Sequence, residues 1–356
     1  MKKVNAFTIA ATFAGCFLGA GYVSGQEMLQ YFGSHGENWW LGLLLAVVFQ
    51  FLLGTVILLV AKSTGNISMD SVAIQWEIPW LRGAMGAMLI LLLFTINVTM
   101  FAGFGAMLQQ LTGLPTVVGS VILVLVVTAL SMLGLRGMVA AFSLFVPALS
   151  VTAVILCVAA LMKHGVQPVT SVAGTSFHGG WAVAALTFVS YNIFGSIGML
   201  TPMAQFLQKK RTAYLGIGLG CGVLTVIAAG IVLAISAYPE SREAELPMLA
   251  VATNLSPAMG IVYAVMLFGG MLGTSLAGTV AIDVYLQQKM PVMKAKRNLF
   301  LPALGLLGLG CSFIGFSEIV GKIYPIFGYA GFLAIFGIFI HFFTLCTRKR
   351  KISRHA

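Results

Sequence analysis

A short stretch near the N-terminus, LGAGYVSGQE over residues 18–27, places three glycines and the carboxylate of Glu27 inside an apolar segment. Glycine lets a helix open, because it has no Cβ and adopts backbone conformations that other residues avoid. A helix interrupted inside a bilayer exposes N–H and C=O groups that lipid cannot satisfy, but a ligand or ion can. N–H groups from Gly21 onward would suit a carboxylate, and carbonyls near Gly15 and Leu18 would suit a small cation. The stretch therefore predicts a binding site.

A second polar cluster, SYNIFGSIGM over residues 190–199, is followed by Thr201 and Pro202. Tyrosine, asparagine, serine and glycine crowd the middle of an otherwise apolar run. Polar groups inside a span are costly and usually face a cavity or a partner. Two interruptions in matching places of two inverted halves are typical of a transporter whose site lies near the bilayer midplane.

The composition places the whole chain in a membrane. Of its 356 residues 59% are hydrophobic and 8% charged, and the mean hydropathy is +1.01, whereas about a quarter of a soluble domain is charged. The apolar runs are too long and continuous for the strands of a β-barrel. We therefore expect an all-α polytopic membrane protein with a single transmembrane domain, residues 1–356, and ten helices. The expected spans are residues 5–34, 39–61, 83–111, 116–133, 137–161, 181–208, 212–237, 256–284, 298–316 and 319–346.

The basic residues predict the orientation of these spans. With the N-terminus in the cytoplasm, 17 of the 20 Lys and Arg residues fall on the cytoplasmic side, and only Lys163, Arg242 and Lys322 fall outside. This asymmetry follows the positive-inside rule, and one span more or fewer would spoil it. Both termini are thus expected in the cytoplasm of a cell (inner) membrane, with residues 347–356 as a basic tail. The net charge of +11 then faces anionic lipid and indicates no nucleic-acid partner.

Ten spans divide into two sets of five, over residues 4–162 and 180–346. Because each set has an odd number of spans, the second is inserted upside down relative to the first. The two interrupted helices, the first and the sixth, each open one set, as an inverted repeat requires.

The remaining reactive side chains predict no enzyme. The five cysteines and five histidines are scattered, without the spacing of a metal site or of a catalytic set. No organic cofactor is expected.

The element Gly19-Ala20-Gly21 resembles the signature in the first span of the amino acid–polyamine–organocation transporters. The region around Phe194 and Gly195 resembles the second unwound segment of the same LeuT-type fold. GAGYVSGQE together with YNIFG is similar in particular to the YkvI-like permeases of bacteria. The resemblance implies a LeuT-like 5+5 inverted repeat with helices 1 and 6 broken.

The resemblance also implies a substrate site. Backbone N–H groups of Ala20 and Gly21 would hold the carboxylate of an amino-acid-like substrate. The substrate-binding residues that it implies are Gly19, Ala20, Gly21, Asn97, Tyr191, Asn192, Phe194 and Ser196. For the aromatic members the alternative is ordinary packing, and for Asn97 it is an interhelical hydrogen bond.

Thr274 and Ser275 in the eighth span resemble the hydroxyl pair with which sodium-coupled members complete a sodium site. Their partners there are carbonyls of the first span, here those of Gly15 and Leu18. Oxygen ligands without a carboxylate suit a hard monovalent cation. The alternative is that each hydroxyl bonds back to the carbonyl four residues earlier. Sodium is thus the expected coupling ion, with a proton as the alternative.

Glu27 is the only acid expected well inside a span. Four roles are open: counter-ion to a substrate amine, proton carrier, outer gate paired with Lys322, or a carboxylate that caps free N–H groups of the break. The whole pattern predicts a secondary transporter that moves an amino acid or related small zwitterion through the bilayer by alternating access. The alternative is a membrane subunit of the germinant-receptor type, which binds an amino acid without transporting it.

Overall fold

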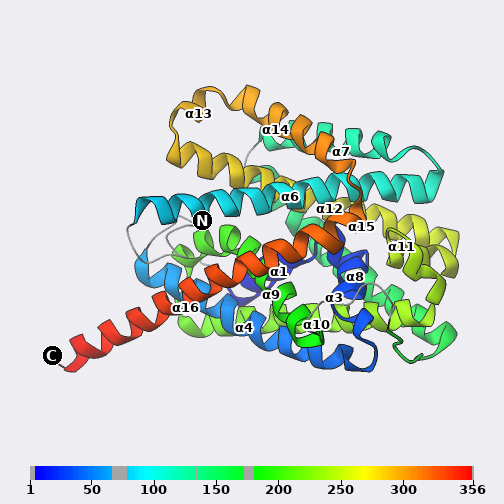
Figure 1. Cartoon of the computed structure of the whole chain (residues 1–356), viewed down its shortest axis with the longest axis horizontal. Helices are drawn as coiled ribbons and strands as arrows, with labels where there is room; N and C mark the ends of the chain where they lie inside the picture. Colours follow the sequence, from blue (N-terminus) through cyan, green and yellow to red (C-terminus); the bar gives the residue numbers. More distant parts are fainter. Residues whose placement is uncertain (1–4, 66–77, 134, 172–179, 355–356) are drawn as a thin grey trace.

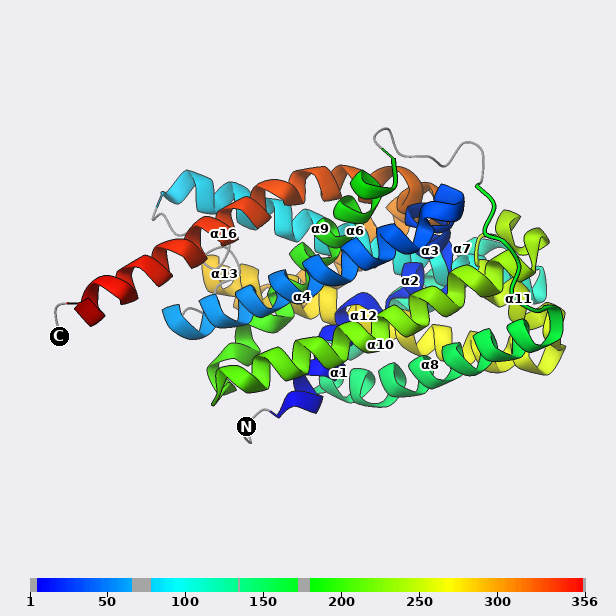
Figure 2. The same cartoon turned by 90° about the horizontal axis from the view of Figure 1, so that it is seen from below.

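The computed structural model describes residues 5–65, 78–133, 135–171 and 180–354. Every regular element in these ranges is a helix, and most of the long helices run along the long axis of the molecule (Figure 1, Figure 2). The expected all-α polytopic fold is confirmed.

Ten helical units match the ten expected spans. Seven helices of the described ranges are long and apolar enough to cross a membrane, and α1, α7 and α14 are shorter. The units are α1 (Ala6–Phe17) with α2 (Ala20–Val23) and α3 (Gln26–Tyr31), then α4 (Trp39–Thr64), α6 (Pro79–Thr112), α7 (Thr116–Ser131), α8 (Leu135–His164), α9 (Gly180–Met203), α10 (Lys210–Ala237), α12 (Pro257–Lys289), α14 (Arg297–Ser312) and α16 (Tyr324–Arg354). The connectors are η1 (Gly33–Asn38), η2 (Ala204–Phe206), η3 (Pro239–Glu243), α11 (Pro247–Leu255), α13 (Val292–Ala295), α15 (Phe316–Glu318) and η4 (Ile319–Ile323).

Helix ends fall where the local chemistry sets them. Ser256 precedes α12, and its hydroxyl accepts the N–H of Met259 at 3.1 Å, which satisfies one donor of the first turn. Gly65 and Gly113 end α4 and α6 with φ of 66° and 76°, in the left-handed region that favours glycine.

The first span is interrupted as the sequence predicts. The N–H of Gly19 turns to the carbonyl of Phe17 at 2.7 Å instead of to that of Gly15, so α1 stops after Phe17. Gly19 is extended, with φ −80° and ψ −179°, and α2 starts after it. Gly25, with φ 88°, makes a second bend before α3.

The sixth span differs from the expectation, because α9 is one continuous helix where a break was predicted. Two of its polar side chains donate to carbonyls of their own helix. Asn192 Nδ2 donates to the carbonyl of Phe188 at 3.0 Å, and Ser196 Oγ to that of Ile193 at 2.8 Å. The helix changes character only after Met203, where η2 follows.

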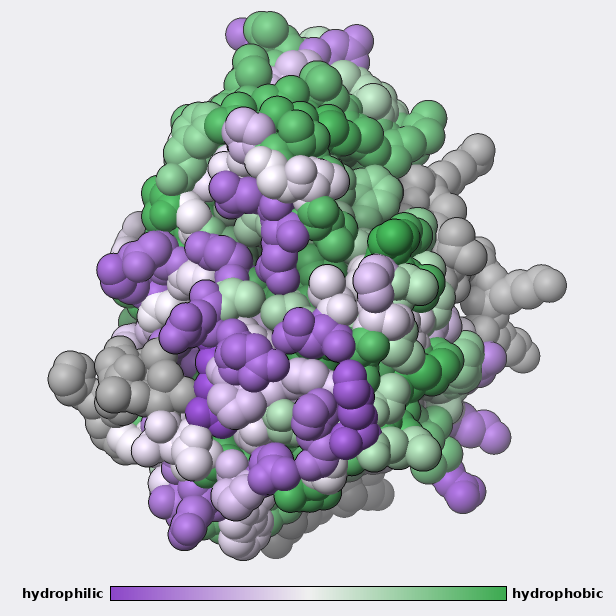
Figure 3. Space-filling model, turned by 90° about the vertical axis from the view of Figure 1, so that its right-hand side faces the viewer, coloured by the Kyte–Doolittle hydropathy of each residue, from purple (hydrophilic) through white to green (hydrophobic). Residues whose placement is uncertain are grey.

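The bundle has two distinct ends. α13 and the C-terminal end of α16 lie towards one end, and α11 lies at the opposite end (Figure 1, Figure 2). Seen from the α11 end, the molecule presents a broad hydrophilic patch bordered by hydrophobic residues (Figure 3). This distribution fits a membrane normal that runs along the long helices.

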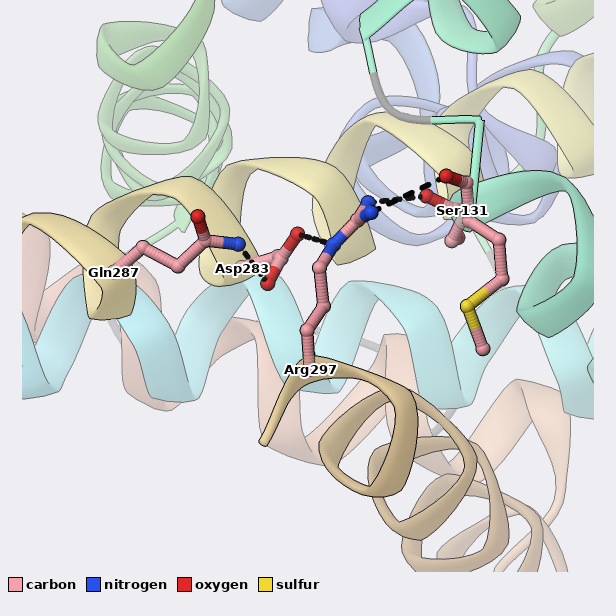
Figure 4. A network of polar contacts seen from close by, with 5 residues as sticks. Ser131, Asp283, Gln287 and Arg297 are labelled. Atoms are coloured by element: carbon pink, nitrogen blue, oxygen red, sulfur yellow. Dashed lines mark hydrogen bonds and ion pairs between the residues drawn. The ribbon is translucent and has the colours of Figure 1, made fainter. Parts of the chain in front are cut away.

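A polar network ties α7, α12 and α14 together near the α13 end (Figure 4). The Arg297 Nε donates to the buried carboxylate of Asp283 at 2.8 Å, and Gln287 Nε2 donates to the same carboxylate at 2.7 Å. The Arg297 guanidinium also donates to the last carbonyls of α7, those of Ser131 at 2.8 Å and Met132 at 3.2 Å. Because the planar fork serves two partners at once, it fixes these three helices against one another.

Candidate functional site

The interrupted first span is held by bonds from three other elements. A break at this depth leaves carbonyls that need donors, and α10, α11 and α12 take part in satisfying this segment. The bonds run from Tyr22 Oη to the Leu224 carbonyl of α10 (2.7 Å), from Tyr263 Oη of α12 to the Val23 carbonyl (2.5 Å) and from Met248 N of α11 to the Ser24 carbonyl (2.8 Å). The interruption is thus stabilised by hydrogen bonds to other helices of the core.

Tyr263→Phe removes one of these bonds while keeping the ring. Because the Val23 carbonyl stays buried without its donor, we expect a loss of about 1 kcal/mol in the free energy of unfolding. Thermal unfolding of the purified protein in detergent measures this change. Tyr214→Phe, on the exposed face of α10, is the matched control, and equal midpoints for the two variants would contradict the assignment.

The N–H groups of the break have unexpected neighbours. The N–H of Ala20 points to the thioether of Met100 at 3.4 Å, which is a weak acceptor. At Gly21, a Cβ would collide with the carboxylate of Glu27, whose Cδ stands 2.7 Å from that position. The structure therefore brings an acid beside the residue predicted to hold a substrate carboxylate, and like charges at such short range repel.

Glu27 is 4% exposed and lies among aromatic side chains. Tyr191 and Asn192 of α9 lie beside its carboxylate, and Tyr31 and Tyr324 lie around it. Ring centroids are 5.7 Å apart for Tyr31 and Tyr191, and 4.9 Å for Tyr191 and Tyr324. We call Glu27, Tyr31, Tyr191 and Tyr324 the Glu27 cage. Among the residues that the structure describes, the Tyr191 hydroxyl and the Asn192 amide are the side-chain donors placed beside the Glu27 carboxylate.

Glu27 and Lys322, predicted as a gate, are not paired with each other in this structure. Lys322 instead pairs with Glu318, four residues earlier, and both side chains are more than half exposed. Residues at this spacing are neighbours on a helix, and a pair at the surface keeps most of its hydration. Lys322 therefore pairs with the exposed Glu318 and not with the buried Glu27.

Two of the predicted sodium ligands, Leu18 and Thr274, lie where α12 passes the break. The Thr274 hydroxyl stands 3.5 Å from the position of a Cβ on Gly19, and the Leu18 carbonyl stands 3.6 Å from that of Gly270, one turn earlier on α12. The hydroxyls of Thr274 and Ser275 are buried without a hydrogen-bond partner among the described residues. The carbonyl of Gly15 has lost its usual donor, the Gly19 N–H.

The two hydroxyls differ from other hydroxyls in the same bundle. Thr95, Thr99 and Thr253 each donate to the carbonyl four residues earlier, at 2.8 to 2.9 Å. Thr274 and Ser275 make no such bond, so the back-bonding alternative is not what the structure has. Their oxygens fit a hard cation, with no carboxylate in the set.

The remaining predicted site residues separate into two groups. Phe194 and Ser196 are buried in α9, where the Ser196 hydroxyl is used by its own helix. Asn97 bonds to α12, where its Nδ2 donates to Thr279 Oγ1 at 3.1 Å. It lines a small cavity that also includes Phe94, Phe101, Thr128, Leu301 and Gly305.

Sequence reasoning missed Tyr31 and Met100. Tyr31 follows Glu27 by four residues, the spacing that puts two side chains on one face of a helix, so this partner was detectable. Met100 carried no comparable signal, because a methionine in an apolar span is ordinarily interpreted as a packing residue.

Solved structures of transporters share this architecture. The inward-facing structure of Mhp1 matches with a TM-score of 0.71 at 15% identity, over 95% of this chain and 76% of that one. A Na⁺-coupled sialic acid symporter in a substrate-bound outward-open state gives 0.69 at 13%, over 95% and 79%. MhsT in complex with L-phenylalanine gives 0.64 at 14%, over 98% of each chain. The chain has the LeuT-type fold of these transporters.

In sequence, the chain is similar to two proteins of Bacillus subtilis (strain 168). The uncharacterized membrane protein YkvI is 21% identical over 345 residues, which cover 94% of this chain and 95% of that protein. The uncharacterized protein YyaD is 22% identical over 324 residues, 88% and 90% of the two chains. No family model matches the sequence.

Proposed function

We propose that this chain is a secondary active transporter that carries an amino acid or related small zwitterion across a cell membrane, coupled to sodium. The observation that carries the proposal is the break between α1 and α2, where backbone groups, two unpartnered hydroxyls and a buried carboxylate meet. Such a break at the depth of the bilayer is typical of transporter sites. The solved relatives support transport, since one is a Na⁺-coupled symporter by its description and another binds L-phenylalanine.

The proposed sodium ligands are the carbonyls of Gly15 and Leu18 with the hydroxyls of Thr274 and Ser275. When bound, the ion supplies positive charge to the break and links α1 to α12. A ligand that binds one conformation better shifts the population towards it, so an ion shared by these two helices would favour the arrangement that binds substrate. The chain itself would bind the substrate: Gly19, Ala20 and Gly21 bring backbone close to it, and α9 closes the site beside them.

The proposed topology has both termini in the cytoplasm and inverted repeats over residues 4–162 and 180–346. The short helix α13 and its neighbours support this side as cytoplasmic, because Lys289, Lys294 and Lys296 gather there. The opposite end carries α11 and the acids Glu240, Glu243 and Glu245.

Thermal stabilisation of the purified protein tests the proposal. We expect one or a few amino acids to raise the unfolding temperature only when sodium is present, because a ligand stabilises the state that it binds. The same ligand should then enter liposomes with an inward sodium gradient. Binding without uptake would overturn transport and favour the sensing alternative, and uptake that a potassium gradient drives equally well would overturn sodium coupling.

A further inference from the structure

The proposed transport leaves one charge unexplained. Glu27 is buried at 4% exposure. It takes part in neither of the ion pairs described above, Arg297 with Asp283 and Lys322 with Glu318, and the described side chains beside its carboxylate are tyrosines and Asn192. A buried carboxylate that stays charged without a cation is strongly destabilising, which makes a cation from outside the chain its natural complement.

The surroundings of Glu27 select the kind of cation. Tyr31, Tyr191 and Tyr324 are each 2% exposed or less, and their rings contact one another around the carboxylate. The faces of aromatic rings attract organic ammonium groups, and this attraction grows when water is excluded. Tyr191 also brings its hydroxyl to the Glu27 carboxylate.

The position of Glu27 beside Gly21 indicates which end of a ligand binds at the Glu27 cage. The carboxylate of Glu27 lies directly against Gly21, so an anionic group bound at Gly21 would meet a second anion. An ammonium at the same place gains an ion pair instead. Sodium has its own candidate ligands at Thr274 and Ser275, where the oxygens are neutral.

We propose that the Glu27 cage binds the ammonium group of the substrate, and that the protein therefore selects ligands by a positive charge and not by a carboxylate. The transport of this ligand rests on the proposed function, whereas its binding at the cage does not. The sequence predicted that Gly21 holds the carboxylate of the substrate. In the structure Gly21 lies beside Glu27, which in this proposal holds the amine instead.

Matched sets of ligands test this selection on the unaltered protein. Each set contains an amino acid, its decarboxylated amine and its hydroxy acid: alanine, ethylamine and lactate; leucine, isoamylamine and 2-hydroxyisocaproate; phenylalanine, phenethylamine and phenyllactate. Thermal stabilisation is measured for each with sodium. We expect shifts for the amino acid and the amine of at least one set and none for its hydroxy acid. A hydroxy acid that binds as well as its amine, or no shift with any amine, would overturn the proposal.

Glu27→Gln keeps the size of the side chain and removes its charge. We expect it to weaken binding of the responsive amine at least tenfold, while Glu318→Gln, which neutralises an exposed carboxylate, leaves binding unchanged. Should Glu27→Gln fail to fold, Tyr191→Leu removes one ring and hydroxyl of the cage and is expected to weaken the same amine. Unchanged amine affinity in the folded variant would overturn the cage. Amine binding to the wild type without uptake into liposomes would instead overturn transport alone.

Discussion

Replacing Thr274 and Ser275 together by alanine is expected to abolish the sodium dependence of ligand binding and uptake while the apo protein keeps its stability. The reason is that the two hydroxyls make no hydrogen bond within the described chain. Both are buried without a hydrogen-bond partner in the described chain, so their removal breaks no bond within the protein and relieves two unsatisfied polar groups. The variant therefore loses the ion and nothing else.

The measurement is the unfolding temperature with sodium and with a large inert cation, for both proteins. We expect the wild type to gain stability from sodium and the double variant to gain none. Thr225→Ala with Thr253→Ala is the matched control, because these hydroxyls donate to carbonyls of their own helices. The control should lose stability and keep its response to sodium. A double variant of Thr274 and Ser275 that still responds fully to sodium would exclude them as ligands.

Much of the fold was predictable because the bilayer restricts the solutions. Apolar runs long enough to span, separated by basic or glycine-containing breaks, leave helices as the only element, and the ten expected spans correspond to ten helical units. The interruption at Gly19 was also predictable, since glycines cluster there beside Ser24 and Glu27. Composition and pattern act locally at these positions, and the bonds to α10, α11 and α12 support the same interruption.

The continuity of α9 was not predictable from the same reasoning. Its composition resembles that of the first span at the break, with Tyr191, Asn192 and Gly195 close together. In the structure, Asn192 and Ser196 donate to carbonyls of their own helix. A polar side chain in a span can bond within its helix or open it, and the sequence alone does not choose between these two outcomes.

Side-chain direction explains the other differences. Asn97 lies on a helix that does approach the break, since Met100 of the same helix meets Ala20. Three residues are nearly one turn, but Asn97 points to Thr279 instead. Lys322 was expected to reach Glu27 on grounds of charge, yet it pairs with Glu318, four residues earlier, where both side chains are exposed. The rotation of each helix is set by packing between elements, which spacing along the chain does not encode.

Gly21→Val is expected to weaken binding of any ligand at the break at least about tenfold. A Cβ at this residue would stand 2.7 Å from Glu27 Cδ and 2.9 Å from its Cγ, closer than atoms can pack, so the Glu27 side chain must shift from its position against Gly21. Overpacking a closed site costs about 1–3 kcal/mol, and each ~1.4 kcal/mol is tenfold in affinity. The loss should appear in affinity as well as in stability, because the displaced group is the one that meets the ligand.

Gly222→Val is the matched control for this change. A Cβ at Gly222 of α10 has no heavy atom within 4 Å, so the control carries the cost of a β-branched residue in a helix without the collision. Affinity is measured by ligand-dependent shifts of the unfolding temperature with sodium present, over a range of ligand concentrations. If Gly21→Val bound ligand as tightly as Gly222→Val, the contact of Glu27 with the backbone of the break would have no part in recognition. A selective loss would place the binding site at the Gly21–Glu27 contact, because the control experiences every other effect of the substitution.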